Sequence, residues 1–218
     1  MEKKDFKGTL KKIWQFIWEE DSIWSWIVNI VLAFVLIKFI VYPGLGLVLA
    51  TDFPIVAVVS GSMHHDEGFD DWWEKGGKWY TDNDITKEDF LGYPSKNGFS
   101  KGDIMVLNGK EPKDIKIGDI VVFKSHAGRP RPDPIIHRVV KKWDEEGDYF
   151  FQTKGDNYRT NKNSINSCDL TGCIDETRIT EEQILGNALI KVPFLGYVKI
   201  WFVEAVCVFN DFNFCIRS

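Results

Sequence analysis

The chain has no surplus of basic charge. Its net charge of −5 over 218 residues gives no field that would attract nucleic acid, so no nucleic-acid partner is expected. It also has no collagen-like repeat and no low-complexity tract, and its length suits one domain with an anchor. Aromatic residues are abundant, with nine Trp and sixteen Phe, and such residues gather in cores and at membrane interfaces.

Cysteine is scarce, and its four copies support no metal site. Cys168 and Cys173 bracket a short loop, and a small disulfide there remains an open alternative if the loop faces an oxidising exterior. No second Cys or His pair at ligand spacing accompanies them, so zinc is not expected. His64 and His65 are adjacent, and on an extended chain they would point to opposite sides. We therefore expect no metal and no cofactor.

One long apolar run occupies residues 23–41, broken only by Ser25, Asn29 and Lys38. At the helical rise it would extend roughly 28 Å, close to the thickness of the bilayer's hydrocarbon layer. The run predicts a transmembrane anchor over residues 23–42. A cluster of tryptophans at its start is typical of an interfacial belt: Trp14, Trp18, Trp24 and Trp26.

The segment before the anchor predicts its direction. Residues 1–22 contain five lysines, and lysines flanking a span favour the cytoplasmic side, so this segment is expected in the cytoplasm and the rest of the chain outside. The apolar run is not a cleaved signal peptide, because it is too long and no small-residue cleavage site closes it. The segment 192–218 is also apolar but interrupted, and could be a second span, an interfacial helix or a packed segment.

Residues 43–191 have the pattern of a mainly β domain outside the membrane. Short β-branched runs are punctuated by Gly, Pro, Asn and Asp, and predict strands at 55–59, 103–107, 119–123, 135–140, 149–153 and 188–192. Residues 181–185 predict one helical turn. Two of the strands begin alike, with Gly102-Asp103-Ile104 and Gly118-Asp119-Ile120, which suggests paired elements. Residues 64–99 form an acidic, aromatic insertion that could enter the lipid interface or form a small satellite core.

The segment Ser60-Gly61-Ser62-Met63 ends the first strand-like run, about twenty residues after the anchor. A hydroxyl between small residues in that setting is typical of a nucleophile, and Gly61 would let the backbone turn sharply and a substrate carbonyl approach. The anchor would hold this hydroxyl near the bilayer. The pattern favours hydrolysis of a substrate that emerges from a membrane.

Four segments with chemical character follow one another in the sequence: 59–63, 118–123, 135–140 with His137, and Thr153-Lys154-Gly155-Asp156-Asn157. Behind a membrane span, this order resembles type I signal peptidases, specifically the archaeal branch similar to the catalytic subunit of the endoplasmic-reticulum complex. The resemblance extends to residues 193–197 and leaves out 64–99 and the chain ends. It implies a signal-peptidase-like β catalytic domain after one transmembrane helix.

The resemblance implies roles for three residues. Ser62 matches the nucleophile, and the Ser60 hydroxyl with the Ser62 backbone N–H matches the oxyanion hole. His137 matches the general base, where bacterial relatives carry lysine. A serine hydroxyl needs such a base, because it is a weak nucleophile at neutral pH.

The acid that would orient His137 has three candidates. Asp156 matches the first aspartate of the family, but the later one, often assigned to the triad, has no counterpart among Asn161, Lys162 and Asn163. Asp156 is our prediction, with Asp169 or an asparagine as open alternatives. The residues after Met63, His64 and His65, also depart from the family.

The resemblance implies a membrane-bound serine endopeptidase that removes signal peptides from secretory precursors at the cell membrane, beside the protein-export machinery. A catalytically inactive, membrane-anchored β domain that binds peptides or partner proteins is the alternative, because the later aspartate is missing. A self-cleaving regulator of the related serine–lysine fold is disfavoured by His137 and by the anchor.

Overall fold

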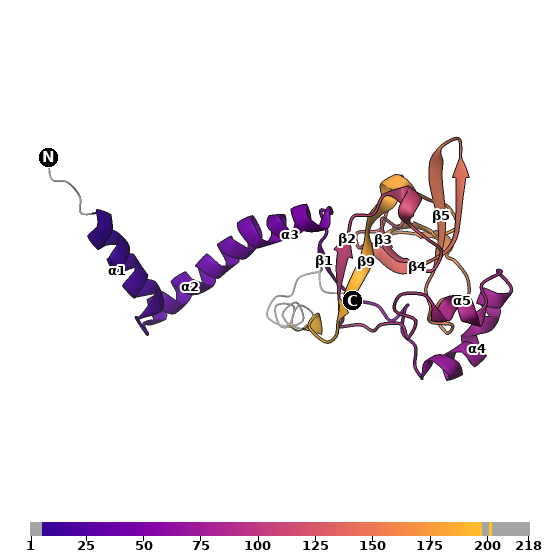
Figure 1. The fold of residues 1–218 in the computed structure, drawn as a ribbon, viewed down its shortest axis with the longest axis horizontal. Helices are drawn as coiled ribbons and strands as arrows, with labels where there is room; N and C mark the ends of the chain where they lie inside the picture. The colour runs from indigo at the N-terminus through magenta and orange to yellow at the C-terminus, as the bar shows by residue number, and fades with distance from the viewer. Residues whose placement is uncertain (1–5, 198–200, 202–218) are drawn as a thin grey trace. The chain divides into compact units, whose positions relative to one another are not determined.

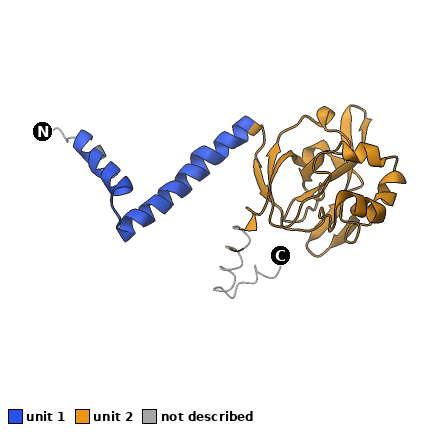
Figure 2. Ribbon diagram, turned by 60° about the horizontal axis from the view of Figure 1, so that its bottom comes forward, with its two compact units in different colours: residues 1–48 blue, residues 49–218 orange. Residues whose placement is uncertain are grey.

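The structure is a computed structural model that describes residues 6–197 and 201. It divides into two compact units, residues 1–48 and residues 49–218 (Figure 2). Most of the apolar C-terminal segment predicted over 192–218 lies outside the described residues. Each unit is described by itself below.

Unit 1 is helical, with α1 over Phe6–Trp18 and a second, continuous helix over Ile23–Leu49 (Figure 1). The second helix consists of α2 (Ile23–Leu36), the π-helical turn η1 (Ile37–Val41) and α3 (Tyr42–Leu49). Its 27 residues are apolar enough to cross a membrane. The helix continues past Pro43 because a wide π turn comes just before it, with the Tyr42 N–H bonded to the Ile37 carbonyl.

Unit 2 is built on a seven-stranded antiparallel sheet in the order β1-β2-β9-β3-β4-β5-β8. The six strands predicted from sequence are β1 (Ile55–Ala57), β2 (Ile104–Asn108), β3 (Ile120–Phe123), β4 (Ile135–Glu145), β5 (Asp148–Lys154) and β9 (Ile184–Val192). Sequence did not predict β8 (Ile179–Thr180), nor β6 (Asn166–Asp169) and β7 (Gly172–Asp175), which form a separate hairpin. The expected helical turn is the 3-10 turn η3 (Glu181–Gln183).

The central strand β3 shows why the sheet is stable. All four of its residues are buried, because each face of the sheet carries its own apolar cluster. Ile120 and Val122 pack on one face with Met63, Met105 and Leu107. Val121 and Phe123 pack on the other face, in a cluster whose further buried members are Ile115, Val139, Phe151 and Ile179.

The two similar strand beginnings adopt the same turn. Gly102 and Gly118 both have positive φ (91° and 94°), which glycine adopts without strain. The aspartate after each glycine accepts the backbone N–H three residues back, at 3.0 Å for Asp103 and 2.9 Å for Asp119. The strands that follow do not pair with each other, because β9 lies between β2 and β3.

The insertion forms α4 (Phe69–Thr81) and α5 (Lys87–Leu91), which lie together on one side of unit 2 (Figure 1). Trp72, Tyr80 and Phe90 are at most 1% exposed and cluster with Val140 of β4. The other aromatic residues of the cluster are partly buried against them: Phe69, Trp73, Trp79 and Tyr93. The insertion is therefore a satellite core, not a set of rings directed at lipid.

The β6–β7 hairpin is closed by a disulfide between Cys168 and Cys173, which the sequence had left open. The two cysteines face each other in the hairpin register. The Ser125 hydroxyl donates to the Cys173 carbonyl at 2.9 Å, which fixes the hairpin to the segment after β3. The chain leaves β7 directly into Glu176.

Candidate active site

The loop that carries Ser62 is held from behind by Asn157. The Asn157 backbone N–H donates to the Ser62 carbonyl at 2.8 Å, and its side-chain amide donates to the Gly61 carbonyl at 2.9 Å. The Met63 carbonyl accepts from the Phe99 N–H at 3.0 Å, and the Met63 side chain is fully buried. The loop is therefore anchored by its backbone and by Met63, while the Ser62 side chain remains partly exposed.

The Ser60 hydroxyl, which is predicted for the oxyanion hole, lies beside the Ser62 hydroxyl. The hydroxyl oxygens of Ser60 and Ser62 are 3.0 Å apart. Among the described residues, no group accepts the Ser62 backbone N–H. Gly61 begins a turn closed by the His64 N–H, but its φ is not positive, so the turn does not need glycine's conformational freedom. A Cβ at this position would meet no atom within 4 Å beyond its two chain neighbours, so the space there is open.

His137 lies on β4, opposite Val121 of β3, and is 3% exposed. Its Nδ1 is hydrogen-bonded to the Glu176 carboxylate, which is completely buried. The same carboxylate accepts the Thr153 hydroxyl at 3.0 Å and the Ile165 backbone N–H at 2.8 Å. Two further donors therefore hold the buried acid beside the imidazole.

This bond decides what the imidazole can do. When Nδ1 carries the proton donated to Glu176, Nε2 has a free lone pair that can accept a proton. The carboxylate also stabilises the imidazolium that forms after that transfer. The pair His137–Glu176 thus has the chemistry of an oriented general base.

The backbone brings the serine loop to the strand that carries this base. Lys154, at the end of β5, pairs with Arg138 of β4, and Asn157 follows three residues later to hold Ser62. The hydrogen bonds of the described residues do not include one between Ser62 and His137. Catalytic hydrogen bonds are often long before substrate binds and tighten in the complex.

The Asp156 carboxylate makes its hydrogen bonds with residues other than His137. It accepts Arg138 at 2.7 Å and Tyr80 at 2.8 Å, and both its oxygens are buried. The reason is strand geometry, because adjacent residues of β4 point to opposite faces and Asp156 lies on the Arg138 side. Burial alone would raise the pKa of Asp156, but Arg138 and His65 more than offset it and hold that pKa below its ordinary value.

The other predicted acids have different partners as well. Asp169 is exposed on the hairpin and pairs with Arg131 at 2.8 Å, and Asn163 accepts the Trp79 indole N–H at 3.0 Å. His64 and His65 have different partners: His64 bonds to Ser100, and His65 stacks on Trp72. The acid that sequence reasoning missed is Glu176. No local pattern in the sequence distinguishes it from the other acidic residues.

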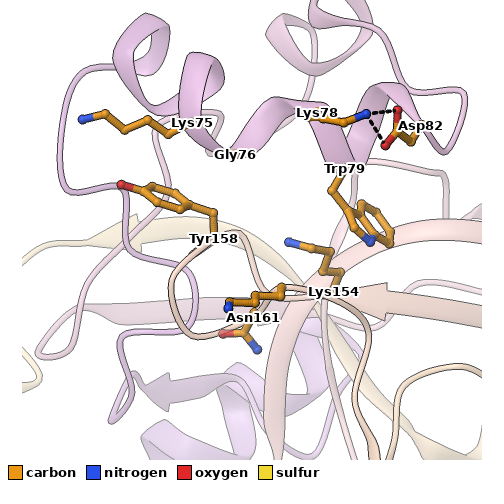
Figure 3. Close-up of a pocket in the computed structure, with 9 residues that line it drawn as sticks. Lys75, Gly76, Lys78, Trp79, Asp82, Lys154, Tyr158 and Asn161 are labelled. Atoms are coloured by element: carbon orange, nitrogen blue, oxygen red, sulfur yellow. Dashed lines mark hydrogen bonds and ion pairs between the residues drawn. The ribbon is translucent and has the colours of Figure 1, made fainter.

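A cavity of about 270 Å³ lies between α4 and the 154–162 segment (Figure 3). Lys154 extends toward it beneath Trp79, and burial lowers the pKa of this lysine to about 8. The lining does not include Ser60, Ser62 or His137, so this cavity is separate from the serine loop and the imidazole. It is lined by Lys75, Gly76, Lys78, Trp79, Asp82, Lys154, Tyr158, Asn161 and Lys162.

Comparisons with known proteins extend the resemblance. No family model matches the chain. Relatives named signal peptidase complex catalytic subunit SEC11 do: that of Komagataella phaffii is 30% identical over 171 residues, covering 76% of each chain. That of Colletotrichum graminicola is 27% identical, covering 76% of this chain and 73% of the relative. Human SEC11C is 28% identical, covering 73% of this chain and 62% of the relative. With this similarity over most of its length, the chain belongs to the family of signal peptidase complex catalytic subunits.

Proposed function

We propose that this protein is a membrane-bound serine endopeptidase that removes signal peptides from secretory precursors. Two observations carry the proposal: the buried pair of His137, on β4, with Glu176, and the Ser60–Ser62 loop that Asn157 holds. The catalytic names of the relatives support the same reaction. The inactive binding-domain alternative depended on a missing acid, and Glu176 provides a carboxylate for His137.

The reaction runs through an acyl-enzyme. His137 Nε2 takes the proton of the Ser62 hydroxyl as its oxygen attacks the scissile carbonyl carbon. The resulting oxyanion accepts hydrogen bonds from the Ser60 hydroxyl and the Ser62 backbone N–H, each worth about 3 kcal/mol in comparable sites. The imidazolium then gives its proton to the leaving amine. Water, deprotonated by the same imidazole, releases the acyl group and restores Ser62.

Glu176 acts as the positioning residue for His137, a role that the sequence had assigned to Asp156. Its carboxylate keeps the proton on Nδ1 and stabilises the imidazolium during each transfer. Asp156 instead binds the Arg138 guanidinium, and its role in the fold is structural.

The substrate strand would bind beside β1. In the part of the chain that the structure describes, this strand is at the edge of the sheet and pairs on one side only, with β2, and it leads within five residues to Ser62. An extended peptide can add to such an edge by backbone hydrogen bonds. Ile55 and Val59 are 40% and 48% exposed there and would contact its side chains.

The helix Ile23–Leu49 anchors the enzyme in the cell membrane, with residues 1–22 in the cytoplasm and unit 2 on the outer face. The relatives are named as subunits of a complex, and the protein-export machinery is the matching source of precursors. The lipid bilayer and the emerging signal peptide are therefore its partners.

The test is cleavage of a secretory precursor by the full chain reconstituted in liposomes. Ser62→Ala and His137→Ala should abolish cleavage, while Ser167→Ala, an exposed serine on β6, should leave it unchanged. Equal processing by the Ser62→Ala protein would refute the proposal. A parent that binds several precursors without cutting any would favour the binding domain.

A further inference from the structure

The polar residues Ser25 and Asn29 interrupt the apolar anchor near its start, and both bond to the helix that precedes it. The Ser25 hydroxyl donates to the Phe16 carbonyl at 2.7 Å, and the Asn29 side-chain amide donates to the Ile17 carbonyl at 2.9 Å. Ser25 is 1% exposed. These two carbonyls belong to the last turn of α1, where an α-helix leaves its carbonyls without internal partners.

These bonds have a specific meaning at a membrane surface. A helix end that meets hydrocarbon must satisfy its carbonyls within the protein, because no water is available there. The anchor itself supplies donors for two of these carbonyls, those of Phe16 and Ile17, where α1 ends against the start of α2. The chain also turns sharply here, and Ser22 caps the start of α2 by accepting the Ser25 N–H.

The sequence of α1 is amphipathic at helical spacing. Leu10, Ile13 and Ile17 share one face, whereas Lys11 and Gln15 share the opposite face. Trp14 falls at the boundary between the faces, and Trp18 lies on the polar side of it, seven residues after Lys11. The two tryptophans are 61% and 70% exposed, and their ring centroids are 5.6 Å apart. Exposed tryptophans at such a boundary are typical of helices that lie in the headgroup region.

We propose that α1 lies in the lipid–water interface of the cytoplasmic leaflet as a second, peripheral anchor, fixed to the transmembrane helix by Ser25 and Asn29. The partner is the bilayer itself, met by the apolar face and the tryptophans. Lys7, Lys11 and Lys12 are exposed and reach phosphates locally. Glu19, Glu20 and Asp21 follow directly, so the segment is charge-balanced and its attraction to lipid is mainly apolar.

The experiment uses the full chain in liposomes, with Cys207 and Cys215 replaced by serine and the Cys168–Cys173 disulfide kept. Single nitroxide labels at positions 11, 14, 15 and 17 are tested for collision with oxygen, which enters lipid, and with a water-soluble nickel chelate. Labels at 14 and 17 should collide more with oxygen, and labels at 11 and 15 more with nickel. Equal nickel access at all four positions would place α1 in water and overturn the proposal. Low access to both reagents would mean that a protein, a partner or a second copy, covers the helix, and would overturn it as well.

A variant pair tests the two hydrogen bonds. Ser25→Ala with Asn29→Leu should abolish the periodic difference between the label positions, because α1 loses its fixed connection to the span. Ile30→Leu, a substitution in the same helix at an exposed position, should preserve it. Retention of the full pattern in the double variant would show that Ser25 and Asn29 do not fix α1. None of these outcomes depends on peptidase activity.

Discussion

Two neighbouring residues of β4, His137 and Arg138, each bind a buried carboxylate, yet on opposite sides of the strand. On one side, Glu176 holds an imidazole that can exchange a proton. On the other side, Asp156 holds a guanidinium that stays protonated. The first arrangement can perform chemistry, whereas the second can only bind.

The donors on the Arg138 side show what that arrangement does. Besides Asp156, the guanidinium donates to the carbonyls of Pro94, Ser95 and Gly118, so it joins the insertion to the sheet. The ring centroid of Phe90, in the insertion, lies 4.5 Å from the guanidinium carbon of Arg138. The comparison teaches that the match to a family motif identified a structural acid, while the acid bonded to the base came from an unmatched segment.

The largest effect is expected on catalytic activity, from a change on the His137 side of β4. Glu176→Gln should lower kcat by about 10⁴-fold, since an amide can favour the wrong tautomer of His137 and cannot stabilise its charged form. KM should stay close to that of the parent, and Glu176→Asp should restore part of kcat. Precursor cleavage by folded, liposome-bound protein measures both constants. Unchanged kcat in Glu176→Gln would remove Glu176 from the mechanism.

The next largest effect is expected on the free energy of unfolding, from a change on the Arg138 side of β4. Asp156→Ala should destabilise unit 2 by about 3–5 kcal/mol, because it leaves the Arg138 charge buried and unpaired. The pKa of Asp156 is held below its ordinary value, so the stabilisation is present at neutral pH and disappears only as strong acid protonates the carboxylate. Chemical denaturation followed by the buried tryptophans measures the change. A fully stable but inactive Asp156→Ala protein would instead return this residue to the catalytic site.

Lys154 should make the stability of unit 2 depend on pH. It lies on the Arg138 side of the sheet and is 1% exposed. Burial lowers its pKa from 10.5 to about 8. Between these values the unfolded chain binds a proton that the folded chain has lost, so stability should rise with pH by about 3 kcal/mol. Lys154→Met should lack that rise. The measurement is the unfolding free energy of the parent and of Lys154→Met from pH 7.5 to 10.5. If the two curves ran parallel, the predicted contribution of Lys154 would be wrong.

The smallest effect concerns the hairpin that leads to Glu176. Replacing Cys168 and Cys173 by serine should cost about 2 kcal/mol, as expected for such a short loop. The loss should appear as faster amide hydrogen exchange in β6 and β7, with a modest fall in kcat. Exchange around Arg138 should not change. Equal acceleration on both sides of β4 would show that the two sides are not independent.

Much of the fold follows from local pattern. The six predicted strands alternate or carry β-branched runs that fit a pleated, half-buried surface, and the apolar run 23–41 lies within the helix Ile23–Leu49. The helices α4 and α5 were not predicted, because their aromatic residues suit a satellite core or a membrane interface equally well. The strand β8 has two residues, too few for a periodic signal.

The sequence alone determined the anchor, the β domain and the roles expected of Ser60, Ser62 and His137, because each depends on residues close together in the chain or on a recognisable order of segments. Only the tertiary structure decided which acid meets the imidazole. Glu176 is 39 residues from His137, and their contact depends on how β4, β5 and the disulfide hairpin assemble. Among 32 acidic residues, no local pattern distinguishes the one whose carboxylate the fold buries against that ring.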